Sequence, residues 1–330
     1  MAQDAEGVWA GFWRRVGAFV FDSLLLGALS VALGSLFFDP LASLGSLGRL
    51  VGLGLGVVYF GLGASAVFGG QTLGKRLLGL KVVQKNGRLV SLPTALARSA
   101  VVVAPIICNG LLWPVTNPVM GLVVVVLSAL LVIGLSLAQV VLLLVNGPDR
   151  RLVHDLLFGT VVVRAGAVDV PVRTPAPWKL GLAVIVPAVA LAALLLFTRQ
   201  MQTWLDPDMK ALTAVQAALL KEPDVSFASV MKYKGVFYPS GKPKRTSETL
   251  QIQAQVTRWP KTPELTARRL ARIAKATYPQ PPKDGVVVVL TYGFDLGFGQ
   301  RFNSFSANYP ADREASARPS APAVTAAQSN

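Results

Sequence analysis

Long runs of apolar residues constrain this chain more than any other feature of its sequence. A helix rises about 1.5 Å per residue, so about 20 apolar residues cross the roughly 30 Å hydrocarbon core of a bilayer. The apolar tract at 99–145 is too long for one crossing, and its prolines divide it near Pro118. The sequence therefore predicts five membrane-spanning helices, at 18–38, 47–68, 99–115, 119–145 and 180–197.

Composition supports the bilayer as the solvent of this chain. The 330 residues are 52% hydrophobic and 15% charged, which is too apolar for an ordinary soluble protein. The net charge is +15, and basic residues lie beside the apolar runs. Basic residues in that position mark a cytoplasmic membrane face, so we expect a lipid bilayer and no nucleic acid as partner.

Two segments between the predicted spans carry this basic charge. Residues 69–98 contain six lysines and arginines and no acidic residue, and 146–173 carry four arginines. The positive-inside rule places both segments and the N-terminus in the cytoplasm. We expect 69–98 to lie along the lipid headgroups, with its charged side chains reaching the water. Five crossings then place the C-terminal domain on the outer side, and a misread split of 99–145 would invert that side.

The domain organisation follows from a change in composition after residue 199. Residues 1–170 form a membrane domain with four spans, and 171–199 hold a linker and the fifth span. Residues 200–310 read as a small soluble α+β domain, and 311–330 as a disordered tail. Its predicted helices are 209–221 and 262–277, and its predicted strands are 225–239, 246–258, 286–292 and 300–306. The fold class is thus an all-α polytopic membrane bundle with a small α+β soluble domain.

Glycines recur at every fourth position of the second predicted span. Gly48, Gly52 and Gly56 fall on one face of a helix, where a neighbouring helix backbone can approach closely. Chance recurrence in a glycine-rich segment is the alternative.

Ionisable residues at the ends of the apolar runs are the candidate site residues. Arg15 and Asp22 are seven residues apart, so they share one helix face, and Asp22 lies inside an apolar run. Asp22 either belongs to an ion pair that holds the helices together or forms a proton or cation site. His154 and Asp155 form a histidine–carboxylate pair suited to proton relay. We expect no metal or other cofactor, because the chain has one histidine and one cysteine, and no enzymatic triad.

Three local segments carry a resemblance to a known family. They are Gly11-Phe12-Trp13-Arg14-Arg15 followed by Asp22, the loop from Gly70 to Gly79, and Asp149 to Asp155 leading to Gly159-Thr160-Val161-Val162-Val163. Through them residues 8–165 resemble the RDD family of membrane proteins. The resemblance implies three or four spanning helices and a bacterial plasma (inner) membrane. It also identifies Arg15, Asp22 and Asp155 as the arginine and aspartates of the family name, and implies cation/proton antiport, as proposed for some members.

Two functional hypotheses follow from these residues. In the first, the protein is a secondary transporter of a proton or small cation, which Asp22 and Asp155 bind alternately while Arg15 sets the charge balance. One short bundle has few buried polar groups, so a complete pathway would require a homo-oligomer. In the second, the protein is a non-catalytic scaffold or envelope-assembly factor, whose C-terminal domain binds a protein partner.

Overall fold

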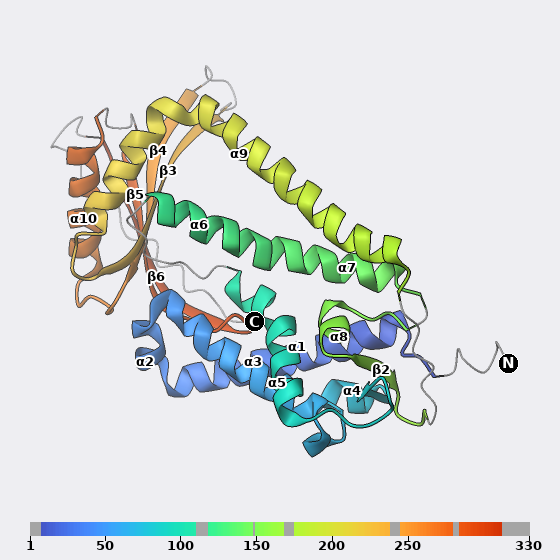
Figure 1. Cartoon of the computed structure of the whole chain (residues 1–330). Helices are drawn as coiled ribbons and strands as arrows, with labels where there is room; N and C mark the ends of the chain where they lie inside the picture. The colour runs from blue at the N-terminus through green and yellow to red at the C-terminus, as the bar shows by residue number, and fades with distance from the viewer. Residues whose placement is uncertain are drawn as a thin grey trace. The chain divides into compact units, whose positions relative to one another are not determined.

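The chain forms two compact units in a computed structural model (Figure 1). The first unit comprises Met1–Met201 and Phe294–Arg301, and the second comprises Gln202–Gly293 and Phe302–Asn330. The structure describes residues 8–109, 118–147, 149–167, 175–237, 245–279 and 284–311. The predicted disordered tail lies outside the described residues, apart from residue 311.

Four helical stretches in the described part of the chain are long and apolar enough to cross a membrane. They are Phe12–Leu36, Gly45–Ala64, Val126–Val145 and Pro177–Phe197. The first is α1 (Phe12–Leu36), and the second combines a short turn, η1 (Gly45–Leu47), with α3 (Gly48–Ala64). The third runs from α6 (Pro118–Ala129) through a π-helical turn, η3 (Leu130–Gly134), into α7 (Leu135–Val145). The fourth is the first half of α9 (Pro177–Leu219). The protein is therefore an integral membrane protein.

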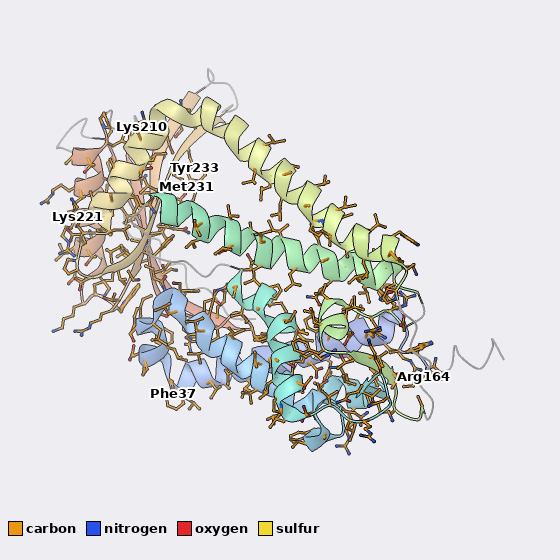
Figure 2. All side chains as sticks on the ribbon, in the orientation of Figure 1. Phe37, Arg164, Lys210, Lys221, Met231 and Tyr233 are labelled. Carbon is orange, nitrogen blue, oxygen red and sulfur yellow. The ribbon has the colours of Figure 1, made fainter. Side chains whose placement is uncertain are left out.

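The outward surfaces of these helices are apolar. Leu24 of α1, Leu144 of α7 and Val184 of α9 are 70%, 64% and 69% exposed. In Figure 2 the side chains along α7 and the first half of α9 consist mostly of carbon, whereas nitrogen atoms gather near Arg164. Side chains of this kind are stable in contact with lipid tails and unfavourable in contact with water.

The predicted third span, 99–115, requires correction. The corresponding helix, α5, covers Leu92–Cys108, and its 17 residues fall short of the four longer stretches. It begins earlier than predicted because Pro93 lies in its first turn, where proline needs no hydrogen-bond partner for its nitrogen. Four of the five predicted spans thus correspond to long apolar helices among the described residues, and α5 is a shorter apolar helix in the place of the other.

The predicted cytoplasmic segments contain strands, which a purely α-helical bundle would lack. Strand β1 (Leu80–Gln84) pairs antiparallel with β2 (Thr160–Arg164), and Trp9 bridges to Val163. Two short helices flank the strands, α4 (Leu73–Leu77) and α8 (Val153–Leu157). The valines of both strands are buried, and Val82 and Val162 belong to one cluster with Ala18, Ala64 and Ala95. The pairing brings the N-terminal segment and both basic segments to one end of the bundle.

The second unit holds a four-stranded sheet with the strand order β3-β4-β5-β6. Its strands are β3 (Val225–Phe237), β4 (Arg245–Val256), β5 (Val286–Asp295) and β6 (Gln300–Tyr309). Strands β4 and β5 are parallel, and α10 (Pro263–Thr277) makes the crossover between them. The helix buries Ala267, Leu270, Ala271 and Ala274, which lie on one face. The predicted mixed α and β character of the C-terminal region is confirmed.

One continuous helix replaces two predicted ones at the start of the C-terminal region. The predicted span 180–197 and the predicted helix 209–221 both belong to α9, which covers Pro177–Leu219. The helix continues through the segment between the two predictions, although that segment contains Pro207. The remaining described elements are short, α2 (Phe38–Ser43) and η2 (Ala66–Phe68).

Glycines allow α3 to pack closely against α5. Gly48, Gly52 and Gly56 are buried on one side of α3, but Gly48 and Gly52 face the backbone of Asp295 and Leu296 and not a neighbouring helix as predicted. A Cβ atom at Gly56 would lie 2.8 Å from a Val103 methyl group of α5. At Gly61 a Cβ atom would lie 2.5 Å from a methyl group of Leu96 and 3.1 Å from its Cα atom. Contact with the backbone of the neighbouring helix leaves no room for a side chain at Gly61.

This packing predicts opposite effects for two glycines of the same helix. Gly61→Ala should lower the stability of the protein by about 1–3 kcal/mol, because α3 and α5 must move apart. Gly54→Ala is the matched control, since a Cβ atom there meets nothing within 4 Å. It should leave stability unchanged or raise it by up to about 1 kcal/mol through helix propensity. Equilibrium unfolding in detergent measures both, and equal effects would contradict the close contact.

Candidate functional site

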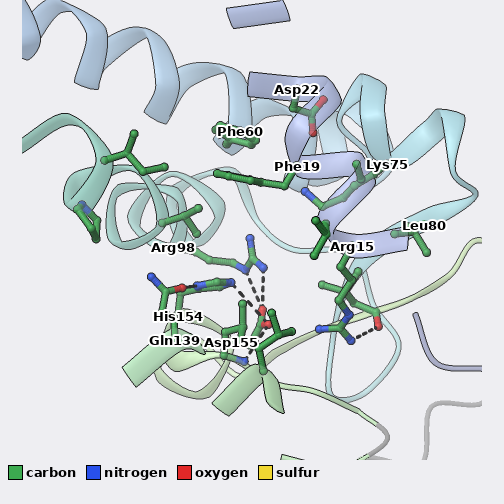
Figure 3. A pocket seen from close by; sticks show the side chains of 18 of the residues that line it. Arg15, Phe19, Asp22, Phe60, Lys75, Leu80, Arg98, Gln139, His154 and Asp155 are labelled. Atoms are coloured by element: carbon green, nitrogen blue, oxygen red, sulfur yellow. Dashed lines mark hydrogen bonds and ion pairs between the residues drawn. The ribbon is translucent and has the colours of Figure 1, made fainter. Parts of the chain in front are cut away.

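A cavity of about 320 Å³ lies inside the first unit, at the end of the bundle where α4, α8 and the two-stranded ribbon meet (Figure 3). Helices α1, α3, α5 and α7 form most of its wall. Its charged and histidine lining residues are Arg15, Asp22, Lys75, Arg98, His154 and Asp155. The sequence-predicted ionisable residues therefore converge on one cavity, together with two cations that the sequence analysis had counted as loop charges.

Asp22 is buried and accepts hydrogen bonds from two other elements. The Tyr59 hydroxyl of α3 donates to Oδ1 at 2.6 Å, and the Gly74 backbone N–H of α4 donates to the same atom at 2.7 Å. The Thr72 hydroxyl donates to Oδ2 at 2.5 Å. Asp22 is 1% exposed, so these donors replace the water that a carboxylate otherwise needs. The carboxylate fastens α1 to α3 and α4.

The glycine at position 74 of the loop motif is required for steric reasons. A Cβ atom at Gly74 would lie 2.3 Å from the Ala18 carbonyl oxygen and 3.0 Å from the Asp22 carboxylate. Only glycine allows the α4 backbone this close to α1, where its N–H reaches Asp22. Thr72 also caps α4, because its hydroxyl accepts a hydrogen bond from the Lys75 N–H at 3.3 Å.

Asp155 is the centre of a second buried network. Arg98 donates from Nη2 at 2.7 Å and from Nε at 3.1 Å to Asp155 Oδ1, and the Thr160 hydroxyl donates to the same oxygen at 2.8 Å. Asp155 and Arg98 are 0% and 4% exposed. Burial is the largest single cause and raises the pKa of Asp155. The Arg98 charge, His154, the Arg15 charge and the hydrogen bond from Arg98 together outweigh it and hold that pKa below its usual range. The ion pair joins α5 to α8 and β2.

His154 lies beside this pair. Its Nδ1 atom is 2.8 Å from Gln139 Oε1 of α7, and its Nε2 atom is 3.6 Å from Asp155 Oδ2. Burial lowers the pKa of His154 to about 3, and the Arg98 charge adds to the effect while Asp155 opposes it. The imidazole is thus neutral at physiological pH, with Nδ1–H donating to the Gln139 oxygen.

Arg15 binds backbone carbonyl groups, and it makes no ion pair with Asp22 in the described structure. Its guanidinium donates to the carbonyls of Asp149, Arg150 and Val162 at 2.7, 2.7 and 3.0 Å, and to that of Ala10 at 3.2 Å. Arg150 has a left-handed backbone with φ of 43°, which is unusual for a residue other than glycine. Arg15 therefore holds the Asp149–Arg150 turn and strand β2 against α1.

Lys75 differs from the other charged residues of the cavity. Within the described ranges its ammonium group makes no hydrogen bond or ion pair, and it lies 5.9 Å from the centre of the Phe60 ring. No dashed line reaches Lys75 in Figure 3, whereas Arg98 and Asp155 are connected. Burial is the main cause that lowers the pKa of Lys75 to about 8. The sequence motif places a lysine here, but the packing of α3 and α4 is needed to show that it faces a cavity.

Metal binding has no visible site in the part of the chain that the structure describes, where histidine, cysteine and carboxylate side chains do not gather in groups of three.

Because the Arg98–Asp155 pair is buried, we expect a substitution of one partner to lower the stability of the protein strongly. Asp155→Asn should lower stability by about 3–5 kcal/mol, because it leaves the Arg98 charge buried without a counter-ion. The double variant Arg98→Met with Asp155→Leu should recover much of that loss, since no charge is left unpaired. Chemical denaturation in detergent checks both, and a double variant no more stable than Asp155→Asn would argue against an electrostatic origin.

The lowered pKa of His154 predicts an acid-sensitive stability. An unfolded histidine binds a proton near pH 6.5 and the folded His154 near pH 3, so the unfolded state gains protons first as the pH falls. Stability should fall by about 1.4 kcal/mol between pH 7 and pH 5.5. His154→Asn, which keeps a donor for Gln139, should lack this part of the slope. Unfolding midpoints of both proteins across that range test it, and parallel slopes would assign the titration to other groups.

Comparison with known proteins covers the region that builds the cavity. The RDD family model matches residues 9–159. The "Uncharacterized protein YckC" of Bacillus subtilis (strain 168) is 30% identical over 161 residues, which are 47% of this chain and 85% of that protein. No solved structure matches. The matched region includes Arg15, Asp22 and Asp155, and the C-terminal sheet lies outside it. The chain therefore belongs to the RDD family.

Proposed function

We propose that this RDD protein is a secondary transporter that couples solute movement to a proton, with the cavity as its site and Lys75 as the proton-binding group. The observation that carries the proposal is the Lys75 ammonium group, which faces the cavity without an ion pair among the described residues. The proposal involves no chemical conversion of the solute.

The hydrogen bonds favour Lys75 over the carboxylates as the proton carrier. Protein groups already donate to both oxygens of Asp22, and to Asp155 from Arg98 and Thr160. Protonation of either carboxylate would disrupt these bonds. Lys75 can gain or lose its proton without breaking a hydrogen bond of the described structure. The hypothesis of alternate binding by Asp22 and Asp155 stays a competing prediction.

The charges in the cavity make the state of Lys75 consequential. Arg15 and Arg98 balance Asp22 and Asp155, so these four groups contribute no net charge. The protonation of Lys75 therefore changes the net charge of the cavity between zero and plus one. A charge that changes at a site of low polarity alters what the site can bind.

The surroundings of Lys75 set the pH at which this change occurs. Burial has the largest effect on its pKa of about 8, Arg98 and Arg15 lower it further, and Asp22 and Asp155 raise it. The charged or titratable groups that line the cavity with it, or contact them, are Arg15 and Asp22 of α1, Tyr59 of α3, Arg98 of α5, and His154 and Asp155 of α8. A proton on Lys75 is exchangeable near physiological pH because the pKa is close to it.

A scaffold role is the second candidate, and a specific observation favours it. The hydrogen bonds of Arg15, Asp22 and Asp155 join α1, α3, α4, α5, α8 and β2 to one another. Such residues would be needed in a protein that only presents its C-terminal domain to a partner. A scaffold does not require a buried lysine that lacks an ion pair among the described residues, so we rank transport first.

Proton flux into liposomes that contain a pH-sensitive dye tests the proposal. We expect the wild-type protein to move protons in response to a pH gradient, and Lys75→Gln to reduce the flux to that of empty liposomes. Removal of a desolvated charge should not lower stability, so the variant should stay folded. Lys85→Gln is the matched control, because Lys85 is exposed in a turn.

The result of this experiment separates the candidates. Suppose that wild type and Lys75→Gln give equal flux and that Asp22→Asn loses flux with an unchanged unfolding midpoint. The proton-binding group would then be the Asp22 carboxylate and not Lys75. Absence of flux above that of empty liposomes with sodium, potassium, an added organic anion or no added solute would favour the scaffold.

A further inference from the structure

We infer that the cavity binds a single-chain anionic amphiphile, with a monovalent carboxylate head against Lys75 and an alkyl chain along the apolar wall. The inference names the solute class of the proposed transporter and rests on that proposal for the use of the site. Binding itself can be tested without transport.

The head group follows from the donors that the cavity leaves free. Asp22 and Asp155 accept hydrogen bonds from Tyr59, Thr72, Gly74, Arg98 and Thr160, so they offer little to a cation from outside. Lys75 contributes an ammonium group whose three donors contact no acceptor in the described residues. With Lys75 protonated the cavity carries a net charge of plus one. One monovalent anion restores neutrality, whereas a second cation would add to the excess.

The alkyl chain of the ligand is inferred from the other residues that line the cavity. Phe19, Phe60, Val102, Ile106 and Leu143 face the cavity from α1, α3, α5 and α7. Figure 3 shows the rings of Phe19 and Phe60 above the Arg98–Asp155 network, with Lys75 beside Phe19. The neutral polar side chains of the lining are Ser136, Gln139 and His154, and the last two already bind each other. Apolar side chains make up most of the rest of the wall, which suits a sugar or a hydrated inorganic ion poorly. The wall provides the apolar contact that an alkyl chain needs.

The volume limits the length of that chain. A water molecule takes up about 30 Å³ in the liquid, so 320 Å³ corresponds to about ten non-hydrogen atoms. Octanoate has this size, whereas a two-chain phospholipid is several times larger. The same carboxylate chemistry could reach the cavity from water or from the bilayer as a fatty acid. In both cases the head group meets the same lysine.

The lysine also predicts a coupling between the anion and the proton. A neutral Lys75 offers no charge to the carboxylate, so octanoate should bind to the protonated form. Because the pKa of Lys75 is about 8, affinity should fall as the pH rises above that value. Anion binding should in turn raise that pKa, since each ligand stabilises the other.

The test uses the full chain in nanodiscs of phosphatidylcholine, with empty nanodiscs subtracted, and octanoate labelled with ¹³C at its carboxylate as the probe. We expect saturable binding at pH 7 that weakens between pH 8 and pH 9.5. Lys75→Gln should abolish it and Lys85→Gln should not. Octyltrimethylammonium, of similar size and opposite charge, should fail to compete, and acetate, which lacks a chain, should compete weakly.

Other outcomes overturn the inference. Equal octanoate binding by Lys75→Gln, or competition by octyltrimethylammonium, would remove the role of the lysine charge. Displacement of octanoate by phosphatidylglycerol at equal concentration would assign the site to a bilayer phospholipid. The proposed function can fail separately from this inference. Octanoate binding without proton flux would support the binding site and contradict the transport function. Proton flux without octanoate binding would contradict only the choice of ligand.

Discussion

The buried ion pair between Arg98 and Asp155 is the interaction on which the membrane domain depends. A charge removed from water is tolerated only when a counter-ion and hydrogen bonds replace its hydration. Asp155 obtains them from Arg98 of α5 and Thr160 of β2, and it lies on α8. Elements that are more than 50 residues apart in the chain must therefore meet at one point. The two-stranded ribbon, the start of α5 and the turn before α8 take their places around it.

Asp22 and Arg15 extend the same requirement to α1. Asp22 needs donors at membrane depth, and α4 can supply its backbone N–H only because Gly74 has no side chain. Arg15 needs acceptors, and it finds them in backbone carbonyls on both sides of the Asp149–Arg150 turn. Three short sequence motifs that are far apart in the chain thus describe one packed end of a bundle. Each supplies donors or acceptors to polar groups that are buried in the protein.

The sequence reveals the spans but not their junction. Helices α1, α3 and the first half of α9 can be predicted from the sequence, because a run of about 20 apolar residues is typical of a membrane-spanning helix. Strand β1 covers five residues inside a basic loop. This is too short for an alternation of apolar and polar residues to indicate a strand. Asp22 and Asp155 are found by their position near apolar runs. Their partners are not, because Thr72, Tyr59 and Arg98 lie on other elements and become partners only through packing.

The same distinction explains why Lys75 stands apart. In sequence it is one of six basic residues between 69 and 98, and positive charge in a loop has an adequate explanation in membrane orientation. In the fold Arg98, from the same group, forms an ion pair with Asp155 through Nε and Nη2, while Lys75 is directed to a cavity with an aromatic wall. A charge that holds the fold together cannot change without cost to stability, so it is poorly suited to binding and release. A charge without a partner is free to change, and that freedom makes the cavity a site where a proton and an anion can each control the binding of the other.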